Sequence, residues 1–349
     1  MKLLMLTRKV DYRDASPAAP TYHLVEKLGD NLDNLYVITW QESDKGDLPE
    51  NIKIISLSGN KFKKIFVLWR QLIKILPKVK GIFCHQNPEY TILAAPLAKL
   101  FRKKIITWYT HGAVSLRLKL VNWLTDKILT ASEKSCRLKN RKKIEITGHG
   151  IDIEYFKPTI ELKEFHRKFK IISIGRISPA KDYQTLIKTT EILADQNKAN
   201  NLEIQIIGGP VLEKDKKYFD NLKQLVKDKD LGSYIKFLGP ISHSQLLPYF
   251  QECDLFTNQS QTGSVDKAVL IAMACEDLVL TSNEAFVDVL KDERLMFEQK
   301  NPKDLADKII NLMNLSEQEK ETIGQRLRQE VVRNHNLDNL VKKIISQFK

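Results

Sequence analysis

Two cations that follow a glycine are the residues of this chain best suited to bind an anion. The segment F-K-I-I-S-I-G-R-I-S-P-A-K-D (169–182) ends an apolar, β-rich run at Gly175, continues with Arg176, and reaches Lys181 before a helical pattern that begins near Tyr183. A strand that stops at a glycine and opens a helix presents free backbone N–H groups at one point. A guanidinium and an ammonium beside them predict a diphosphate site that needs no metal. An ordinary loop with two solvated cations is the alternative.

Small polar residues precede a second helical pattern further along the chain. The stretch Q-S-Q-T-G-S-V-D-K-A-V-L-I-A-M-A-C (259–275) sets Thr262, Gly263, Ser264 and Val265 just ahead of an apolar helix. Their N–H groups and hydroxyls could hold a second anion or the hydroxyls of a sugar. Further candidates follow predicted strands, where ligands of parallel sheets collect: His111-Gly112, T-G-H-G-I-D (147–152), Gly208-Gly209-Pro210 and Gly239-Pro240.

These loops need a scaffold that brings strand ends together, and the chain alternates short apolar strands with helical patterns twice. The strands predicted in the first half are 3–6, 35–38, 52–57, 81–84, 104–109, 126–130 and 143–146, with helices at 21–28, 66–76 and 91–100. The second half predicts strands at 170–174, 202–207, 235–238, 254–257 and 278–281, with helices at 183–195, 214–229, 244–251, 268–275 and 285–290 and helical patterns beyond Pro302. This alternation predicts two doubly wound parallel sheets, with ligand loops facing one cleft between the domains.

Length and composition agree with two domains in one soluble chain. With 349 residues, 42% hydrophobic and 28% charged, the chain is too long for one ordinary core and is not disordered. The N-terminal M-K-L-L-M-L-T has too short an apolar stretch for a signal peptide, and no apolar run reaches membrane-spanning length. The four cysteines form no CxxC pair, which argues against structural zinc and favours reduced thiols in a cytoplasm.

The net charge of +13 predicts an anionic partner: a phosphorylated substrate, an anionic membrane surface or a nucleic acid. Nucleic acid is disfavoured because no RNP, KH, zinc-finger or helix-turn-helix signature accompanies the charge. Between Lys61 and Lys80 cations alternate with apolar residues at helical spacing, with Trp69 at the margin. Such a basic amphipathic helix can lie on anionic lipid. A surface helix with its apolar face in the core is the alternative.

The motifs together resemble the retaining glycosyltransferases of the GT-B fold, of the glycosyl transferases group 1 (family four) type. The pieces that carry the resemblance run in family order over most of the chain: W-Y-T-H-G (108–112), T-A-S (130–132), T-G-H-G-I-D with F-K-P (147–158), I-G-R-I-S-P-A-K-D (174–182), I-I-G-G-P (206–210), F-L-G-P (237–240) and D-K-A-V-L-I-A-M-A-C (266–275). The resemblance implies an α/β protein with an N-terminal acceptor-binding Rossmann-like domain at 1–158 and a nucleotide-sugar-binding one at 159–330. It also implies a C-terminal helix at 331–349 that packs back toward the first domain.

The resemblance also implies roles for single residues. Arg176 and Lys181 match the pair that binds the donor diphosphate and stabilises the leaving group, with Gly175 beside them. His111 matches a histidine that reaches toward the transferred sugar, although a structural histidine is the alternative. The loop 263–265 matches backbone amides that face the sugar and phosphate. The other donor-site candidates are Thr262, Asp266, Lys267, Ile271, Gly208, Gly239 and Pro240. No metal and no cofactor are implied, only the nucleoside-diphosphate sugar.

Two departures from the family pattern bear on catalysis. The family carries two glutamates eight positions apart, for sugar and ribose, and the matching positions are Gly263 and Ile271. Losing a carboxylate–ribose contact of about 1.5–3 kcal/mol should weaken donor binding about 10- to 100-fold. The T-G-S-V-D-K form resembles a variant in which Asp266 and Lys267 take part. The first loop has D-Y-R-D-A-S-P-A-A-P in place of the usual glycine pair. Asp11, Arg13 and Asp14 there are candidates for the acceptor, and a plain surface loop is the alternative.

The resemblance therefore implies an enzyme that moves a hexose-type sugar, with retention of configuration, to a saccharide or lipid-linked saccharide. The expected setting is cell-surface glycan synthesis, in the cytoplasm or peripherally at the inner membrane face. A non-catalytic GT-B protein that binds a nucleotide or glycan as partner or sensor is the main alternative, favoured by Ile271. A sugar-nucleotide epimerase of the same fold is a minor one.

Overall fold

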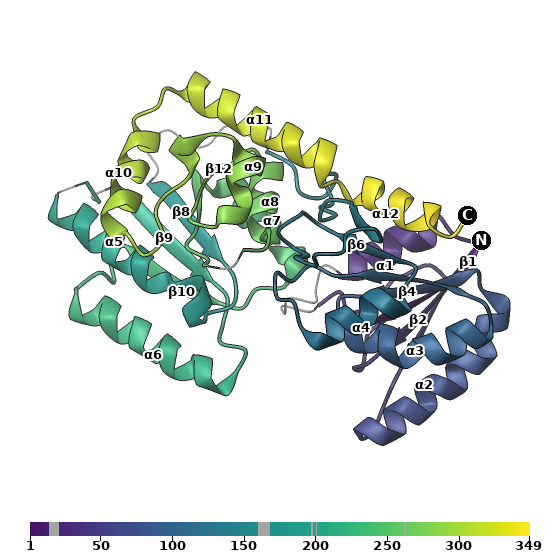
Figure 1. Ribbon diagram of the computed structural model, residues 1–349. Helices are drawn as coiled ribbons and strands as arrows, with labels where there is room; N and C mark the ends of the chain where they lie inside the picture. Colours follow the sequence, from purple (N-terminus) through teal and green to yellow (C-terminus); the bar gives the residue numbers. More distant parts are fainter. Residues whose placement is uncertain (14–20, 160–167, 197, 200, 262) are drawn as a thin grey trace. The chain divides into compact units, whose positions relative to one another are not determined.

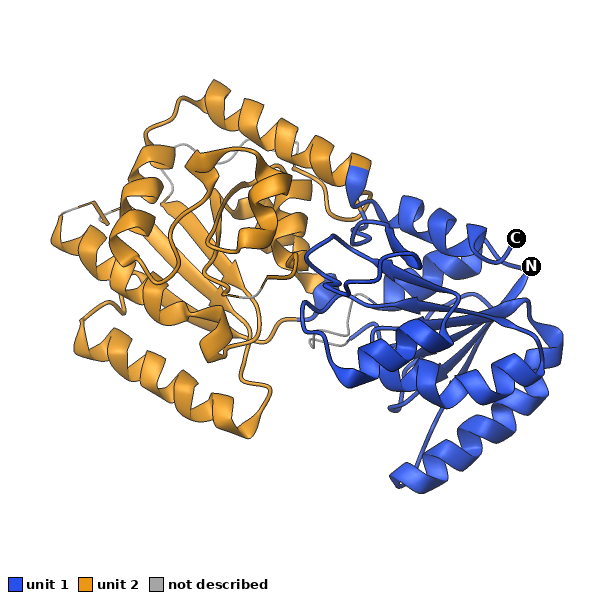
Figure 2. Ribbon diagram, in the orientation of Figure 1, with its two compact units in different colours: residues 1–152, 242–244, 334–349 blue, residues 153–241, 245–333 orange. Residues whose placement is uncertain are grey.

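The computed structural model describes residues 1–349 except 14–20, 160–167, 197, 200 and 262 (Figure 1). The chain folds into two compact units. Unit 1 comprises Met1–Asp152, Ser242–Ser244 and Asn334–Lys349, and unit 2 comprises Ile153–Ile241 and Gln245–Arg333 (Figure 2). The sequence places the domain boundary after residue 158, whereas the first segment of unit 1 ends at Asp152.

Unit 1 is built on a parallel sheet of seven strands in the order β3-β2-β1-β4-β5-β6-β7. Its strands are β1 (Lys2–Thr7), β2 (Asn34–Thr39), β3 (Ile52–Ser56), β4 (Gly81–His85), β5 (Lys104–Trp108), β6 (Lys127–Thr130) and β7 (Ile144–Ile146). Its helices are α1 (Thr21–Asp30), α2 (Lys61–Ile75), α3 (Pro88–Leu100), α4 (Leu116–Leu124) and α12 (Leu337–Ser346). Every residue of β4 is buried, as expected for a central strand with both faces covered.

Unit 2 is built on a parallel sheet of five strands in the order β10-β9-β8-β11-β12. Its strands are β8 (Phe169–Ile174), β9 (Leu202–Ile207), β10 (Ile235–Gly239), β11 (Leu255–Asn258) and β12 (Leu278–Thr281). Its helices are α5 (Tyr183–Asp195), α6 (Glu213–Asp228), α7 (Leu247–Glu252), α8 (Lys267–Ala274), α9 (Val287–Leu290), α10 (Pro302–Met313) and α11 (Glu317–Asn334), whose last residue belongs to unit 1. The two doubly wound sheets confirm the predicted α/β class.

The strand order of each sheet reverses at one point, and ligands of doubly wound sheets bind outside such a point. In unit 1 the reversal lies between β1 and β4, and in unit 2 it lies between β8 and β11. The pairing of Ile171 with Leu255 and of Ile172 with Phe256 fixes the register of β8 on β11. The loops that leave these two strands are therefore the ones expected to meet a ligand in unit 2.

The last helix completes the core of unit 1. Leu340, Val341 and Ile344 of α12 are buried in the same apolar cluster as residues of β1 and α1. Backbone hydrogen bonds hold its entrance: Ile151 N donates to His335 O (2.6 Å), and Leu337 N donates to Ile151 O (2.9 Å).

The T-G-H-G-I-D motif (147–152) packs against the backbone that leads into α12. Gly148 has φ +79°, and a Cβ on it would lie 1.7 Å from Asn334 O. A side chain at residue 148 would therefore collide with the backbone that leads into α12. This backbone contact is a structural reason for the glycine, alongside the ligand role that its strand-end position predicts.

The structure adds one helix and corrects another. The sequence analysis names no helix between 104–109 and 126–130, and α4 lies there, capped by Ser115, whose Oγ accepts from Leu118 N. The helix predicted at 66–76 begins five residues earlier, at Lys61, because Asn60 caps it by accepting from Lys63 N. Both helices begin at a polar cap of the usual kind.

The remaining expectations concern cysteines and membrane spans. Cys84, Cys136, Cys253 and Cys275 are all buried free thiols. In the part of the chain that the structure describes, no helix is both long and apolar enough to cross a bilayer.

Candidate functional site

The candidate site of unit 2 lies at the carboxyl edge of its sheet, where glycines let three backbones come together. Gly208 N donates to Gly239 O (2.9 Å). Gly208 has φ +139°, and a Cβ on it would lie 1.9 Å from Gly175 O. Tyr183 donates its hydroxyl to the same oxygen (3.1 Å). The ends of β8, β9 and β10 thus converge, and only glycine fits at residue 208.

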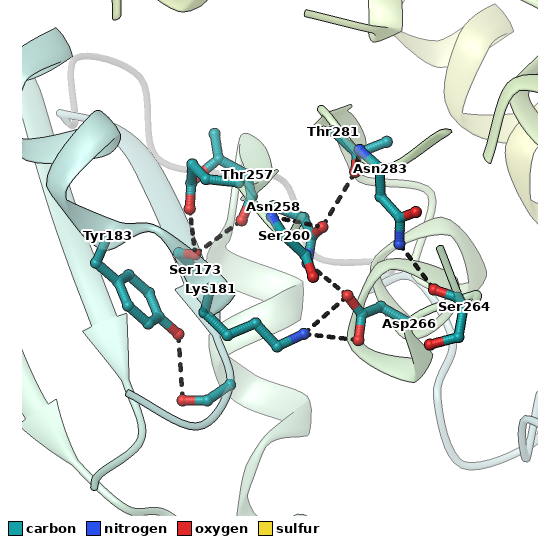
Figure 3. A network of polar contacts seen from close by, with 12 residues as sticks. Ser173, Lys181, Tyr183, Thr257, Asn258, Ser260, Ser264, Asp266, Thr281 and Asn283 are labelled. Atoms are coloured by element: carbon teal, nitrogen blue, oxygen red, sulfur yellow. Dashed lines mark hydrogen bonds and ion pairs between the residues drawn. The ribbon is translucent and has the colours of Figure 1, made fainter. Parts of the chain in front are cut away.

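Lys181 and Asp266 join the loops on the two sides of the point where the strand order reverses. Lys181 Nζ lies 2.7 Å from Asp266 Oδ1 and 2.8 Å from Oδ2, and the side chains are 20% and 21% exposed (Figure 3). Lys181 follows β8, and Asp266 follows β11. The predicted cation therefore stands at the ligand-binding position of a doubly wound sheet, held by a carboxylate.

A chain of hydrogen bonds connects Asp266 to residues at the end of β12 (Figure 3). Asn258 Nδ2 donates to Asp266 Oδ2 (3.1 Å), and Thr281 Oγ1 donates to Asn258 Oδ1 (3.1 Å). Asn283 N donates to Thr281 Oγ1 (3.1 Å), and Asn283 Nδ2 donates to Ser264 O (2.7 Å). Asn258 and Asn283 are buried. Buried amides with matched partners hold the loop that contains Ser264 and Asp266 in one conformation.

The start of α8 carries a second cation. Asp266 is the N-cap residue of α8, but its side chain makes no capping bond because it accepts from Lys181 and Asn258. Burial lowers the pKa of the next residue, Lys267, to about 8, although the residue keeps some exposed surface. Among the described residues none accepts a hydrogen bond from its amine. An ammonium beside an uncapped helix N-terminus favours an anion there.

Several buried polar atoms at this edge lack a partner within the described ranges. They are Ser178 Oγ in the loop after β8, Thr257 Oγ1 and Gln259 Nε2 at the end of β11, and Ser282 Oγ after β12. Buried polar groups in proteins nearly always find a hydrogen-bond partner. Four such atoms on adjacent strand ends make this edge the part of unit 2 best prepared to receive a polar ligand.

The other predicted donor residues differ in how far they are exposed to solvent. Arg176 is exposed, and Ile177 N, next to it, donates to Gly209 O (3.0 Å). Gly263 and Ser264 are half-buried and Val265 is buried, while Pro240 is exposed. Ile271 is only 4% exposed, among the buried residues of α8. Thr262 lies outside the described residues.

The predicted residues of unit 1 follow β1 and β5. His111 is exposed, and its ring makes an edge contact with Tyr109 at 5.6 Å between centroids. Asp11 Oδ2 pairs with Lys9 Nζ at 2.7 Å, and Asp11 Oδ1 accepts from Arg13 N (2.9 Å). Burial opposes ionisation of Asp11, but these bonds outweigh it and lower its pKa. Asp14 lies outside the described residues.

The sequence analysis missed polar groups at or just after the ends of β11 and β12 in unit 2 and at the ends of β1 and β4 in unit 1. In unit 2 these are Asn258, Thr281 and Asn283. In unit 1, Thr7 Oγ1 and His85 Nδ1 lie 3.1 Å apart, buried at the ends of β1 and β4. A signal was present, because a polar residue ends each of these apolar strands. The sequence analysis assigned roles to residues of the loops that follow the strands, but to none of these strand-ending polar residues.

Two doubly wound parallel sheets, one with converging glycine turns and cations at its carboxyl edge, define a two-domain Rossmann-like protein of the GT-B fold. Residues 159–330 match the model of the family Glycosyl transferases group 1, and this part of the chain belongs to that family.

Curated relatives agree with the family. A D-inositol 3-phosphate glycosyltransferase of Paenarthrobacter aurescens is 25% identical over 179 residues, which cover 49% of this chain and 43% of the relative. An uncharacterized glycosyltransferase of Methanocaldococcus jannaschii is 26% identical over 143 residues, which cover 40% of this chain and 38% of the relative. The matched stretches thus span less than half the length of these relatives.

Solved structures resemble the whole chain in fold. Anabaena HepE, crystallised with UDP, aligns over 99% of both chains with a TM-score of 0.78 and 14% identity. Sucrose-phosphate synthase of Thermosynechococcus elongatus aligns over 100% of this chain and 98% of its own, with a TM-score of 0.77 and 14% identity. At such identities the likeness speaks for the fold alone.

Proposed function

We propose that this protein is a glycosyltransferase that moves a sugar from a nucleoside-diphosphate donor to a saccharide or lipid-linked saccharide, with retention of configuration. The observation that carries the proposal is the placement of Lys181 at the strand-order reversal of unit 2, beside the glycine turns and the uncapped start of α8. Membership of residues 159–330 in a glycosyltransferase family supports it, as does the fold shared with a protein crystallised with UDP.

The chemistry asks the protein to stabilise a leaving diphosphate. In the proposed reaction the bond from the anomeric carbon to the diphosphate oxygen breaks, and its electron pair leaves with the diphosphate. The acceptor hydroxyl oxygen bonds to the same carbon on the same face, and its proton passes to the departing diphosphate. Arg176 and Lys181 neutralise the charge that develops on the diphosphate, with Lys267 as a third cation. Together with the carboxylate of Asp266, these three cations leave a net positive charge at the proposed diphosphate site. Because this charge can balance the diphosphate, the proposal includes no obligatory metal. His111 is the proposed contact of unit 1 to the transferred sugar.

The proposed acceptor belongs to cell-surface glycan synthesis, with the reaction on the cytoplasmic side of the membrane. One structural neighbour, S. aureus TarM, was crystallised with fondaparinux, alpha-GlcNAc-glycerol and UDP; it aligns with a TM-score of 0.71 at 11% identity. That structure supports a saccharide-type acceptor for this fold. Asp11 and Arg13, after β1, are the proposed acceptor contacts.

Calorimetric titration with UDP, GDP, ADP and their common sugar conjugates tests the donor site. One nucleotide family should bind the native protein, and Arg176→Ala should weaken that binding. Proton NMR of a product from an acceptor screen then tests retention, because the anomeric coupling of donor and product must match. Absence of nucleotide binding up to millimolar concentrations would reject the proposed function.

A second function is a non-catalytic protein that binds a nucleotide or glycan. Ile271 favours it, because an aliphatic side chain stands where the family has a ribose-binding glutamate. Nucleotide binding without transfer to any acceptor, and without slow hydrolysis of the sugar conjugate, would favour this second function over the first.

A further inference from the structure

Helix α2 of unit 1 has two apolar faces, and the core uses only one. Leu68, Leu72 and Ile75 are buried against the sheet. On the outer side, side chains spaced by three or four residues point to solvent; they are Phe62 (84% exposed), Phe66 (71%), Trp69 (42%) and Ile73 (52%). A surface helix normally carries polar residues there. The second apolar face is therefore unexplained by folding.

Helix α4 repeats this pattern next to α3. Its outer side exposes Leu116 (81%), Leu120 (41%) and Trp123 (70%). Arg117 pairs with Glu89 at the start of α3, and Lys99 near its end lies 4.3 Å from the centre of the Trp123 ring. The two helices therefore run side by side, as Figure 1 also shows.

Helix α3 links the two apolar faces into one surface. Trp69 Nε1 of α2 donates to Leu93 O of α3 (3.1 Å), so α2 lies along the other side of α3. Leu100, the last residue of α3, is 74% exposed. We call the outer sides of these three helices the α2–α4 surface. It holds eight of the fifteen large apolar side chains that are exposed among the described residues. Exposed apolar side chains gathered in one place mark an interaction site.

The charge of the α2–α4 surface selects the kind of partner. Helix α2 carries five cations (Lys61, Lys63, Lys64, Arg70 and Lys74), α4 carries two (Arg117 and Lys119), and neither helix has a carboxylate. The single carboxylate of α3, Glu89, is paired with Arg117. A second copy of this chain would oppose like charges across such an interface, which disfavours a dimer. An anionic apolar partner is complementary in both respects.

We propose that the α2–α4 surface docks on an anionic lipid bilayer. Exposed phenylalanine, leucine and tryptophan side chains enter the boundary between headgroups and acyl chains, while the surrounding cations bind lipid phosphates. Each cation near such a membrane strengthens binding about fivefold. The protein binds the bilayer peripherally, and its affinity for the bilayer falls with rising salt. The inference stands on unit 1 alone and does not require the proposed sugar transfer.

Flotation of the whole protein with vesicles tests the surface. Vesicles of phosphatidylcholine with about a third phosphatidylglycerol should bind the protein, whereas pure phosphatidylcholine should bind it roughly 100-fold more weakly or not at all. The variant K61Q/K63Q/R70Q should lose about 100-fold in affinity for the anionic vesicles. The variant F62S/F66S/W123S should lose a similar factor.

Matched variants elsewhere control for total charge and hydrophobicity. K214Q/K217Q/K227Q removes three exposed lysines of α6, and V211S/V287S removes two exposed apolar side chains of unit 2. Both should bind anionic vesicles like the native protein. All substituted positions are exposed, so thermal melting should change little. Retained nucleotide binding by the surface variants would show that unit 2 is intact.

Tryptophan fluorescence reports the docked face directly. Brominated lipids should quench Trp69 and Trp123 but not Trp108, which is 2% exposed, and W123F should lose the Trp123 share of the quenching and keep that of Trp69. The proposal is overturned if anionic vesicles do not bind the protein, or if the α6 control weakens binding as much as the α2 variant. Self-association that shields Trp123 without vesicles would equally overturn it, because the surface would then be an interface between copies.

Discussion

Asp266 accepts hydrogen bonds from Lys181 Nζ through both carboxylate oxygens, at 2.7 and 2.8 Å. The carboxylate therefore partly balances the charge of the cation that the diphosphate should meet. Asn258 donates to the same carboxylate, which keeps Asp266 compensated when the ammonium turns toward a ligand. The pair therefore orients Lys181 before binding and leaves Asp266 with a partner afterwards. Such preorganisation reduces the ordering cost of binding.

Lys181→Ala should weaken nucleoside diphosphate binding about 10- to 100-fold, since a charge-assisted bond is lost and Asp266 stays close to the phosphates. The double variant K181A/D266A should recover part of that loss, because the repelling carboxylate is removed. Calorimetry on the four members of this double-mutant cycle measures the coupling. Additive losses would contradict the proposed role of Asp266.

Nucleotide affinity should fall as the pH rises from 7 to 9. The folded pKa of Lys267 is about 8, below the usual 10.5, because burial disfavours the ammonium. Above pH 8 the amine is neutral and no longer attracts an anion. Lys267→Met should bind weakly at both pH values and lose most of this dependence. A Lys267→Met profile parallel to that of the native protein would rule out this amine.

The same pKa has a consequence for stability. Between pH 8 and 10.5 the unfolded chain carries a proton on Lys267 that the folded chain does not, so the free energy of unfolding contributed by this group rises with pH in that window. Lys267→Met should remove this rise and stabilise the free protein near neutral pH. Urea titrations at pH 7 and 9.5 on both proteins measure the difference.

Acid should lower the free energy of unfolding of unit 1 by protonating His335 in the unfolded chain. Burial lowers the pKa of this histidine to about 4, so the unfolded chain binds its proton first as the pH falls below about 6.5. The free energy of unfolding then drops by up to about 1.4 kcal/mol per pH unit between pH 6.5 and 4. In His335→Asn the amide oxygen, which like Nδ1 of the ring is two bonds from Cβ, can still accept from His149 N, as Nδ1 does at 3.2 Å. Calorimetric melting between pH 5 and 7 should show a shallower slope for this variant.

Gly208→Ala should disrupt the site. Its Cβ would lie 1.9 Å from Gly175 O at a φ of +139°, so the segment that carries Arg176 must move. We expect a loss of at least about 2 kcal/mol in the free energy of unfolding and loss of nucleotide binding. Gly209→Ala is the control, since its Cβ would make only an ordinary contact with Pro240 at 3.6 Å. Equal tolerance of both substitutions would contradict the convergence of the three strand ends.

Ile271→Glu tests the departure from the family pattern. If residue 271 matches the ribose-binding glutamate, the substitution should tighten nucleotide binding about 10-fold or more. Because Ile271 is only 4% exposed, the new carboxylate should also lower the melting temperature of the free protein. Ile271→Gln, which is uncharged, provides the comparison. Unchanged affinity in both variants would show that residue 271 does not contact the nucleotide.

Local patterns sufficed for most of the fold. The helix Tyr183–Asp195 and the strands Leu202–Ile207 and Leu278–Thr281 have the predicted bounds, because each is bounded by residues that change the periodicity. Helix α4 was missed because Arg117 and Lys119 interrupt its apolar residues, and its exposed face is itself apolar. Helix α2 was expected to have one apolar face and has two, because its cations likewise lie between its apolar residues and hide the second face in the sequence.

The candidate site was predictable only in part. Composition and strand ends pointed to Gly175, Arg176 and Lys181, since cations after a glycine stand out locally. The carboxylate that Lys181 binds lies 85 residues away along the chain, and no local pattern pairs the two. The buried amides of Asn258 and Asn283 were missed because asparagine after a strand is also an ordinary turn residue.

Helix α12 gives the synthesis of this protein an unusual order. The ribosome makes the sheet of unit 1 first, then all of unit 2, and only then the helix whose Leu340, Val341 and Ile344 fill the core of unit 1. At about 5–20 residues per second, the apolar groove that α12 will occupy stays open while nearly two hundred residues are added. The first domain to begin folding is thus the last to finish.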